Sequence, residues 1–265
     1  PLKLLEIGAG IGTMIERLVE WELLGDVEYT ALDSELENID FARKRLLDWG
    51  TQNQYQIAEK GTELQFSSPK CKILVKLSTV DLFDFLDQQR KSRCWDFIIA
   101  HAFLDLIDVP TTLPRIFDIA RPGGFYYFSI NYDGLTVLEP AIDQEFDHFV
   151  LELYHRTMEQ RLRDGQQYGD RNTGRSLISQ IQYAGGRVLA SGSSDWVVYP
   201  QEAGYPEDES YFLHFIINTI YRALEHHADL DNQKFADWIR QRHDQIDQHK
   251  LVYIAHQLDY FGICP

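Results

Sequence analysis

One stretch near the start of the chain constrains its fold more than any other. An apolar run over residues 4–7 breaks into three glycines, Gly8, Gly10 and Gly12, after which apolar residues return at helical spacing. This pattern predicts a strand, a tight turn and a helix. Glycine suits such a turn because it adopts positive φ and lets a ligand approach the backbone, while the next helix offers free N–H groups. We therefore expect a nucleotide-like ligand over this turn, the alternative being a purely structural turn.

The spacing of the glycines narrows the choice of ligand. A dinucleotide fingerprint places a third small residue at position 13, which is threonine here, so a nicotinamide cofactor is disfavoured. The pattern that is present, Glu6-x-Gly8-x-Gly10-x-Gly12, resembles the first motif of the class I S-adenosylmethionine-dependent methyltransferases. The resemblance implies S-adenosyl-L-methionine as cofactor. It also implies that Glu6 faces the cofactor's ammonium group and that Gly8, Ala9 and Gly10 line its site.

A second acidic residue stands where the ribose of such a cofactor would lie. Residues 27–32 alternate as a strand and end at Asp33, about 20 residues beyond the glycine turn. The two oxygens of a carboxylate accept hydrogen bonds from both ribose hydroxyls at once. Asp33 could instead cap the helix that follows. We favour the ribose role for Asp33, with Ser34 beside it in the cofactor site and available as the helix cap.

Three further segments resemble the same family, and together the features cover about the first half of the chain. Asp81 and Leu82 match the positions that contact adenine, the alternative being a solvated loop acid. A buried strand over residues 95–100 leads to His101 and Phe103, which should lie beside the reactive methyl group because ligands bind beyond the carboxyl ends of parallel strands. Residues 121–124, Arg-Pro-Gly-Gly, form the turn before an aromatic strand. His101 is the candidate general base, and an equally weighted alternative is a hydrogen-bonded structural histidine.

The expected fold is α/β: a doubly wound, mostly parallel seven-stranded sheet with an antiparallel last strand and helical insertions that form a lid. A hairpin is expected in the polar stretch 50–70, and the fifth strand, 125–130, should close near residues 131–134. Tyr132 and Asp133 would contact the methyl acceptor. The expected parts are a cofactor-binding core (1–131), a lid (132–175), a core helix and strand (176–199), a helical insertion (200–250) and the final strand (251–265).

The lid contains a predicted amphipathic helix over residues 144–163. Its polar face carries His148, Glu152, His155 and Glu159, whose spacing is compatible with metal binding. We favour a solvated polar face and expect no metal.

Charge and cysteine content limit the partners and the compartment. Among 265 residues, 25 Lys and Arg face 41 Asp and Glu, so the formal net charge is −16. This charge disfavours nucleic acid and anionic membranes as partners, although solubility alone would also explain it. Three scattered cysteines favour a reducing cytoplasm over a disulfide framework. No membrane span is expected, and the family's usual helices before the first strand would require a further N-terminal segment.

These features predict a methyltransferase that transfers the methyl group of S-adenosylmethionine in line to the oxygen or nitrogen of a small-molecule acceptor. A non-catalytic protein that binds S-adenosylmethionine or S-adenosylhomocysteine is the first alternative, and a nicotinamide-dependent oxidoreductase the second. A homodimer is compatible with the sequence.

Overall fold

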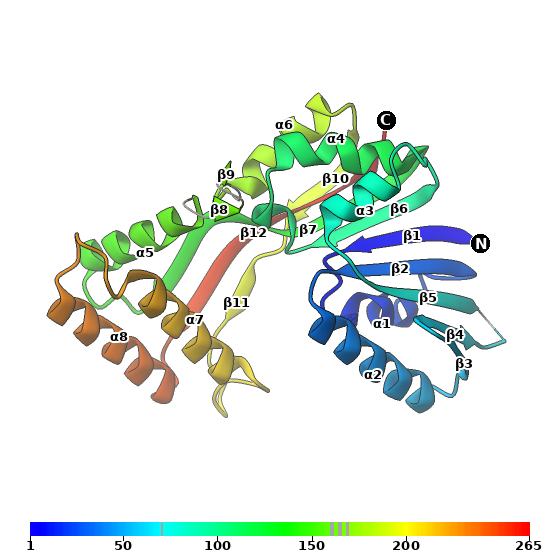
Figure 1. Ribbon diagram of the computed structural model, residues 1–265. Coiled ribbons are helices and arrows are strands. Elements are labelled where there is room, and N and C mark those ends of the chain that lie inside the picture. The colour runs from blue at the N-terminus through cyan, green and yellow to red at the C-terminus, as the bar shows by residue number, and fades with distance from the viewer. Residues whose placement is uncertain (70, 160–161, 164–165, 168–169) are drawn as a thin grey trace. The chain divides into compact units, whose positions relative to one another are not determined.

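The computed structural model describes residues 1–69, 71–159, 162–163, 166–167 and 170–265 (Figure 1). The chain divides into two compact units. Unit 1 comprises Pro1–Asn131, Ser176–Gly192 and Asp259–Pro265, and unit 2 comprises Tyr132–Arg175 and Ser193–Leu258.

A ten-stranded sheet has the strand order β10-β12-β7-β6-β1-β2-β5-β4-β3, with β11 beside β12. The strands are β1 (Leu2–Ile7), β2 (Val27–Asp33), β3 (Gln56–Lys60), β4 (Glu63–Ser67), β5 (Lys72–Thr79), β6 (Trp95–His101), β7 (Ala120–Glu139), β10 (Arg187–Ser193), β11 (Trp196–Val198) and β12 (Val252–Ile263). The central neighbours β5, β2, β1, β6 and β7 are parallel. Their carboxyl ends therefore meet at one edge of the sheet.

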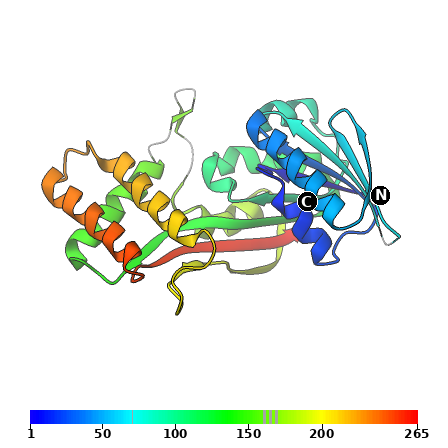
Figure 2. The same ribbon diagram turned by 90° about the horizontal axis from the view of Figure 1, so that it is seen from below.

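The last strand, β12, lies beside β7 and runs against it (Figure 2). The Cys264 N–H donates to the Gly124 carbonyl, whereas the Asp259 carboxylate accepts from the Ile130 N–H, so the residue numbers of the two strands run in opposite directions. The predicted mostly parallel sheet with an antiparallel last strand is confirmed, but the described sheet has ten strands rather than the expected seven. The expected hairpin is also present, as the antiparallel pair β3 and β4 at the sheet edge.

The fifth strand is longer than predicted. The expectation that it closes near residues 131–134 is wrong, because β7 continues to Glu139. Buried residues recur at Asp133, Thr136 and Leu138, with one extra unburied residue between the first two. Gly134, at φ 73°, lets the strand pass through what reads in sequence as a turn.

Helices cover both faces of the unit 1 sheet (Figure 1). α1 (Thr13–Glu20) and α2 (Leu36–Gln52) lie on one face, and α3 (Leu82–Gln88), α4 (Val109–Ile119) and α6 (Thr173–Tyr183) on the other. The first face holds a core that includes Tyr29, Leu46, Phe66 and Val75, all fully buried. Burying one such side chain contributes about 1.5–3 kcal/mol.

Unit 2 packs α5 (Gln144–Glu159), α7 (Glu209–Leu224) and α8 (Asn232–Asp247) around its own core, which includes Val150, Leu213, Ile217 and Trp238. Two short strands, β8 (Leu162–Arg163) and β9 (Gln166–Gln167), pair with each other. In the described ranges, no helix combines the length and hydropathy that crossing a bilayer requires.

The predicted lid helix differs from α5 in extent and in its buried face. The helix ends at Glu159 rather than residue 163; residues 160–161 and the Glu159 side chain lie outside the described part. The expected solvated polar face is wrong at His155, which is 5% exposed and has Nε2 3.1 Å from Thr136 Oγ1. Within the described residues, no three His, Cys, Asp or Glu side chains are grouped for metal binding.

Candidate functional site

The glycine turn follows β1 at the sheet edge where the parallel strands end. Gly8, Gly10 and Gly12 have φ values of 68°, 53° and 78°, a region that favours glycine. The Ala9 N–H donates to the Leu32 carbonyl at 2.8 Å, which fastens the turn to β2. The three left-handed glycines therefore end β1, and the hydrogen bond holds the turn against the end of β2.

Two of the glycines have different surroundings. A Cβ atom at Gly8 would lie 2.4 Å from Cδ2 of Phe103, so the Phe103 ring covers this glycine. A Cβ atom at Gly10 would meet no atom of the described residues within 4 Å. The structure thus brings the predicted acceptor contact Phe103 onto the turn and leaves open space over Gly10.

Asp33 closes the turn from the end of β2. Its Oδ2 accepts from the Gly10 N–H at 2.9 Å, and its Oδ1 accepts from the Glu35 N–H at 2.9 Å and from Asn38 Nδ2 at 3.1 Å. A carboxylate has about four acceptor positions, so about one remains for a further donor. Asp33 therefore joins the glycine turn to the start of α2. The same carboxylate makes the hydrogen bonds at the start of the helix and is the group predicted to bind the ribose.

The predicted helix cap at Ser34 is wrong. The N-cap position of α2 is Glu35, without a side-chain cap hydrogen bond, and the exposed Ser34 hydroxyl lies 3.3 Å from Glu35 Oε1. Asp33 supplies the local hydrogen bond that Ser34 was expected to make.

Glu6 is buried beneath the turn. It is 3% exposed, and its Oε2 accepts from the Tyr29 hydroxyl at 2.7 Å. Burial raises the pKa of Glu6 to about 8; the Tyr29 hydrogen bond opposes this rise and the charge of Asp33 adds to it. Glu6 is therefore a neutral carboxylic acid at neutral pH, and sequence reasoning missed its partner Tyr29.

Asp81 and Leu82 lie where β5 ends. Asp81 is the N-cap of α3 and accepts from the Phe83 N–H at 2.8 Å, while Leu82 is buried. The Val80 N–H donates to the Asp33 carbonyl at 2.9 Å, which brings this segment beside the end of β2. Asp81 is thus a helix cap rather than a solvated loop acid, and its contact with adenine stays a prediction.

His101 ends β6 among polar neighbours that the sequence did not reveal. Its Nδ1 is hydrogen-bonded to Ser129 Oγ. Its ring packs edge-on against the Tyr127 ring, with 5.4 Å between the two ring centroids. Burial lowers the pKa of His101 to about 4, although the nearby Asp259 carboxylate acts in the opposite direction. Nε2 of this neutral ring is buried and has no hydrogen-bond partner among the described residues.

Tyr127, Ser129 and Asp259 complete this cluster: the Tyr127 hydroxyl donates to Asp259 Oδ2 at 3.1 Å. Ser129 pairs with His101 in the parallel register of β6 and β7, a contact that strand alignment would have suggested. Asp259 comes from a strand 130 residues downstream, and no local signal predicts it.

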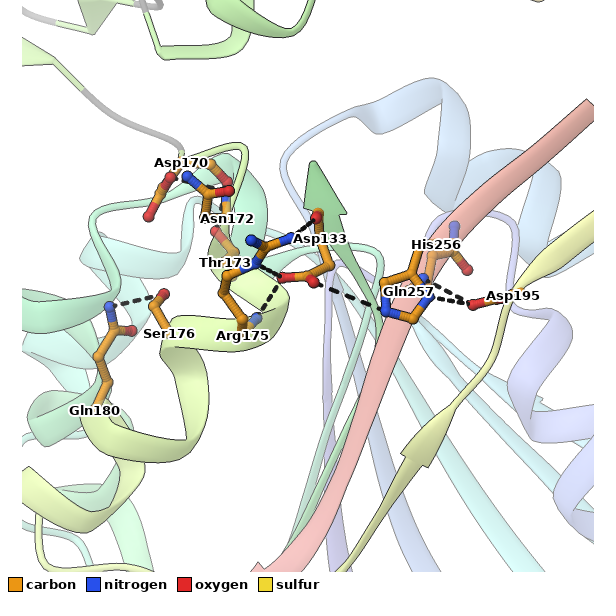
Figure 3. A network of polar contacts seen from close by, with 10 residues as sticks. All are labelled: Asp133, Asp170, Asn172, Thr173, Arg175, Ser176, Gln180, Asp195, His256 and Gln257. Atoms are coloured by element: carbon orange, nitrogen blue, oxygen red, sulfur yellow. Dashed lines mark hydrogen bonds and ion pairs between the residues drawn. The ribbon is translucent and has the colours of Figure 1, made fainter. Parts of the chain in front are cut away.

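Tyr132 and Asp133 belong to unit 2. The Tyr132 hydroxyl lies 2.9 Å from Thr136 Oγ1. Asp133 is buried, accepts from Arg175 N and Nε, and lies 3.8 Å from Nε2 of His256, whose Nδ1 is 2.7 Å from Asp195 (Figure 3). The acceptor contacts expected of Tyr132 and Asp133 stay predictions.

Comparison with known proteins found similarity of structure only. No protein-family model and no curated protein matches the chain. Among solved structures, phosphoethanolamine N-methyltransferase 2 of Haemonchus contortus is similar at a TM-score of 0.43 and 11% identity, covering 100% of this chain and 49% of that one. Geranyl diphosphate C-methyltransferase of Streptomyces coelicolor is similar at a TM-score of 0.46 and 7% identity, and the match covers 100% of this chain and 74% of that one.

The YcgJ protein of Bacillus subtilis is similar at a TM-score of 0.45 and 13% identity, covering 99% of this chain and 91% of that one. The present chain spans about half the length of the Haemonchus enzyme. Likeness at this level establishes neither an activity nor a cofactor for this chain.

Proposed function

We propose that this chain is an S-adenosylmethionine-dependent methyltransferase that acts on a small-molecule acceptor. The observation that carries the proposal is the turn Gly8–Gly12, tied to β2 by the Asp33 carboxylate, with open space over Gly10. This turn lies beyond the carboxyl ends of parallel strands, where open α/β sheets bind ligands.

The site residues fit this cofactor better than a dinucleotide. Thr13 stands where a dinucleotide fingerprint has a small residue, and β12 runs against β7. The backbone of Gly8, Ala9 and Gly10 would hold the amino-acid tail of the cofactor and Asp33 its ribose, with Glu6, Ser34, Asp81, Leu82 and His101 as the remaining cofactor residues. When bound, S-adenosylmethionine supplies an electrophilic methyl group on a sulfonium.

The chain's own task is to position the acceptor and exclude water. His101 is neutral at physiological pH, so its ring can accept a proton from an acceptor hydroxyl. An amine that arrives unprotonated needs no such base. Oxygen and nitrogen acceptors are therefore both included in the proposal, and the net charge of −16 favours neutral or cationic ones.

A second candidate function is a non-catalytic binder of S-adenosylmethionine or S-adenosylhomocysteine. The observation that favours it is His101 itself, whose burial and hydrogen bond to Ser129 also suit a structural histidine. Turnover with a panel of hydroxyl and amine acceptors separates the two candidates, because only the enzyme converts S-adenosylmethionine to S-adenosylhomocysteine.

The test is calorimetric titration of the protein with S-adenosylhomocysteine, S-adenosylmethionine and NAD. We expect binding of the first two, weakened at least tenfold in Asp33→Ala. Asp48→Ala is the matched control, because it removes one exposed carboxylate from α2 and should bind like the original chain. Binding of NAD alone, or of none of the three, would overturn the proposal.

A further inference from the structure

Glu6 is a buried carboxyl group on the face of β1 that also carries Leu4. The parallel register of β1 and β2 pairs Leu4 with Tyr29 and Glu6 with Ala31, so Glu6, Tyr29 and Asp33 share one face of the sheet. Tyr29 is fully buried and donates its hydroxyl hydrogen to Glu6. No ion pair joins Glu6 to a basic side chain in the described part of the chain.

Two charged groups on the helices that cover this face, Arg45 and Arg17, interact with residues other than Glu6. On the helices covering this face, Arg45 donates Nε and Nη2 to the Glu16 carboxylate at 2.7 and 2.8 Å. The positive charge of Arg17 acts on His101, whose ring is hydrogen-bonded to Ser129. Among the described residues, the groups that act on the Glu6 carboxyl are the Tyr29 hydroxyl, as a hydrogen-bond donor, and the like charge of Asp33.

We propose that Tyr29 is a positioning residue for cofactor capture: it holds the protonated Glu6 in place, and binding of a cofactor's ammonium group at Glu6 releases that proton to solvent. The inference rests on the proposed function and deepens it, because it states how the same site recognises a charged amino-acid tail.

The physical reason is the cost of a buried charge. An unpaired carboxylate in an apolar interior is unfavourable, so Glu6 keeps its proton in the free protein. An incoming ammonium supplies the missing positive charge, Glu6 ionises, and its proton passes to a buffer base. The Tyr29 hydroxyl keeps its hydrogen and becomes a charge-assisted donor to the carboxylate. With a Glu6 pKa of about 8, nearly all of the free protein carries this proton at pH 7.

The experiment is calorimetric titration with S-adenosylhomocysteine at pH 7 in several buffers that differ in ionisation enthalpy. The dependence of the measured enthalpy on the buffer gives the number of protons released. We expect about 0.9 proton per bound ligand from the original chain, and none in Glu6→Gln. Binding without proton release would overturn the inference while leaving the proposed function intact. Failure of the original chain to bind would overturn the proposed function and, with it, the inference.

Tyr29→Phe tests the positioning role. Loss of the hydroxyl removes a hydrogen bond that lowers the pKa of Glu6, so at pH 8 the variant should release more protons than the original chain and bind more weakly. Tyr55→Phe is the control: its hydroxyl lies 3.8 Å from Cys71 Sγ, and both proton release and affinity should stay unchanged. Equal proton release by Tyr29→Phe and the original chain at pH 8 would overturn the role of Tyr29.

Discussion

Glu6 and His101 are both held in their neutral forms by burial, but their pKa values move in opposite directions. The Glu6 carboxyl keeps a proton that it would lose in water, and the His101 ring loses one that it would hold at mildly acidic pH. In the proposed function, an ammonium-bearing ligand would meet an acid able to ionise at Glu6, and an acceptor would meet an uncharged imidazole at His101. Each perturbed group also makes the stability of the fold depend on pH.

Glu6 should make the protein less stable as the pH rises. Between pH 4.5 and about 8, unfolded Glu6 has lost its proton while folded Glu6 retains it, so raising the pH favours unfolding. Relative to Glu6→Gln, the free energy of unfolding of the original chain should fall by up to about 1.4 kcal/mol per pH unit. Urea denaturation of both proteins at pH 5, 6.5 and 8 measures this, and a constant difference would contradict it.

His101 should stay neutral through most of the acidic range. Because burial lowers its pKa to about 4, its imidazole NMR signals should not move between pH 8 and 5.5, unlike those of an ordinary histidine at about 6.5. Its contribution to stability is present above pH 6.5 and is lost as the pH falls toward 4. A His101→Gln spectrum assigns the signals, and a midpoint above pH 6 would contradict the burial argument.

Some features of the strands and helices can be predicted from local sequence, whereas others depend on contacts between residues far apart in the chain. The spacing of Gly8, Gly10 and Gly12 predicts the strand, the turn and the helix because each glycine is needed locally for positive φ. Asp33 is also predictable from local sequence, because it is an acidic residue at the end of a recognisable strand. Tyr29 and Asp259 were missed because each meets its partner only through strand pairing.

The limits of β7 and α5 also depended on packing. β7 continues past Gly134 with β12 as a neighbour in the sheet, and no local signal in residues 131–134 reveals that partner. His155 lies on the buried side of α5 because Thr136 accepts or donates a hydrogen bond there. A helical wheel assigns a histidine to the polar face by type, whereas the fold buries it by contact.

Alanine substitutions at Gly8 and Gly10 should differ in their effect on the stability of the fold. Gly8→Ala combines a positive φ with a Cβ atom 2.4 Å from the Phe103 ring, whereas Gly10→Ala has only the positive φ. We expect the free energy of unfolding to fall by about 1–2 kcal/mol in Gly10→Ala and by distinctly more in Gly8→Ala. Urea denaturation measures both. Phe103→Leu should recover part of the Gly8→Ala loss, and equal losses in the two alanine variants would contradict the packing of Phe103 on Gly8.

In unit 2, a buried ion pair joins α5 to α8. Arg242 is fully buried, with Nη2 2.7 Å from Asp147 Oδ1, and the Trp238 indole N–H donates to the same carboxylate. Asp147→Asn should lower the free energy of unfolding by about 3–5 kcal/mol, because it removes the carboxylate that pairs directly with the buried Arg242 guanidinium.

The matched control for Asp147→Asn is Asp143→Asn, which breaks the exposed pair of Asp143 with Lys234 at 2.9 Å. An exposed ion pair contributes about 0–1 kcal/mol, so the control substitution should change the free energy of unfolding little. Similar losses in the two variants, measured by thermal or urea unfolding, would contradict the argument from burial.

The chain as a whole combines a strongly acidic surface charge with two compact units, and only the first property is evident from composition. The division into units arises because residues far apart in sequence return to the same core: Ser176–Gly192 and Asp259–Pro265 join the N-terminal 131 residues. Every cofactor residue proposed above, from Glu6 to His101, lies in unit 1. Ligand binding should therefore stabilise unit 1 directly.

Hydrogen exchange with and without S-adenosylhomocysteine tests this localisation. A ligand at 100 times its dissociation constant stabilises the binding-competent state by about 2.7 kcal/mol, and amides that exchange by local opening gain protection only where that opening disrupts the site. Peptides covering the glycine turn and the Asp33 segment should exchange about 100-fold more slowly, whereas those from α7 and α8 should keep their rates. Equal protection of α7 and α8 would mean that opening of the site requires unit 2 to unfold as well, and would contradict a cofactor site built by unit 1 alone.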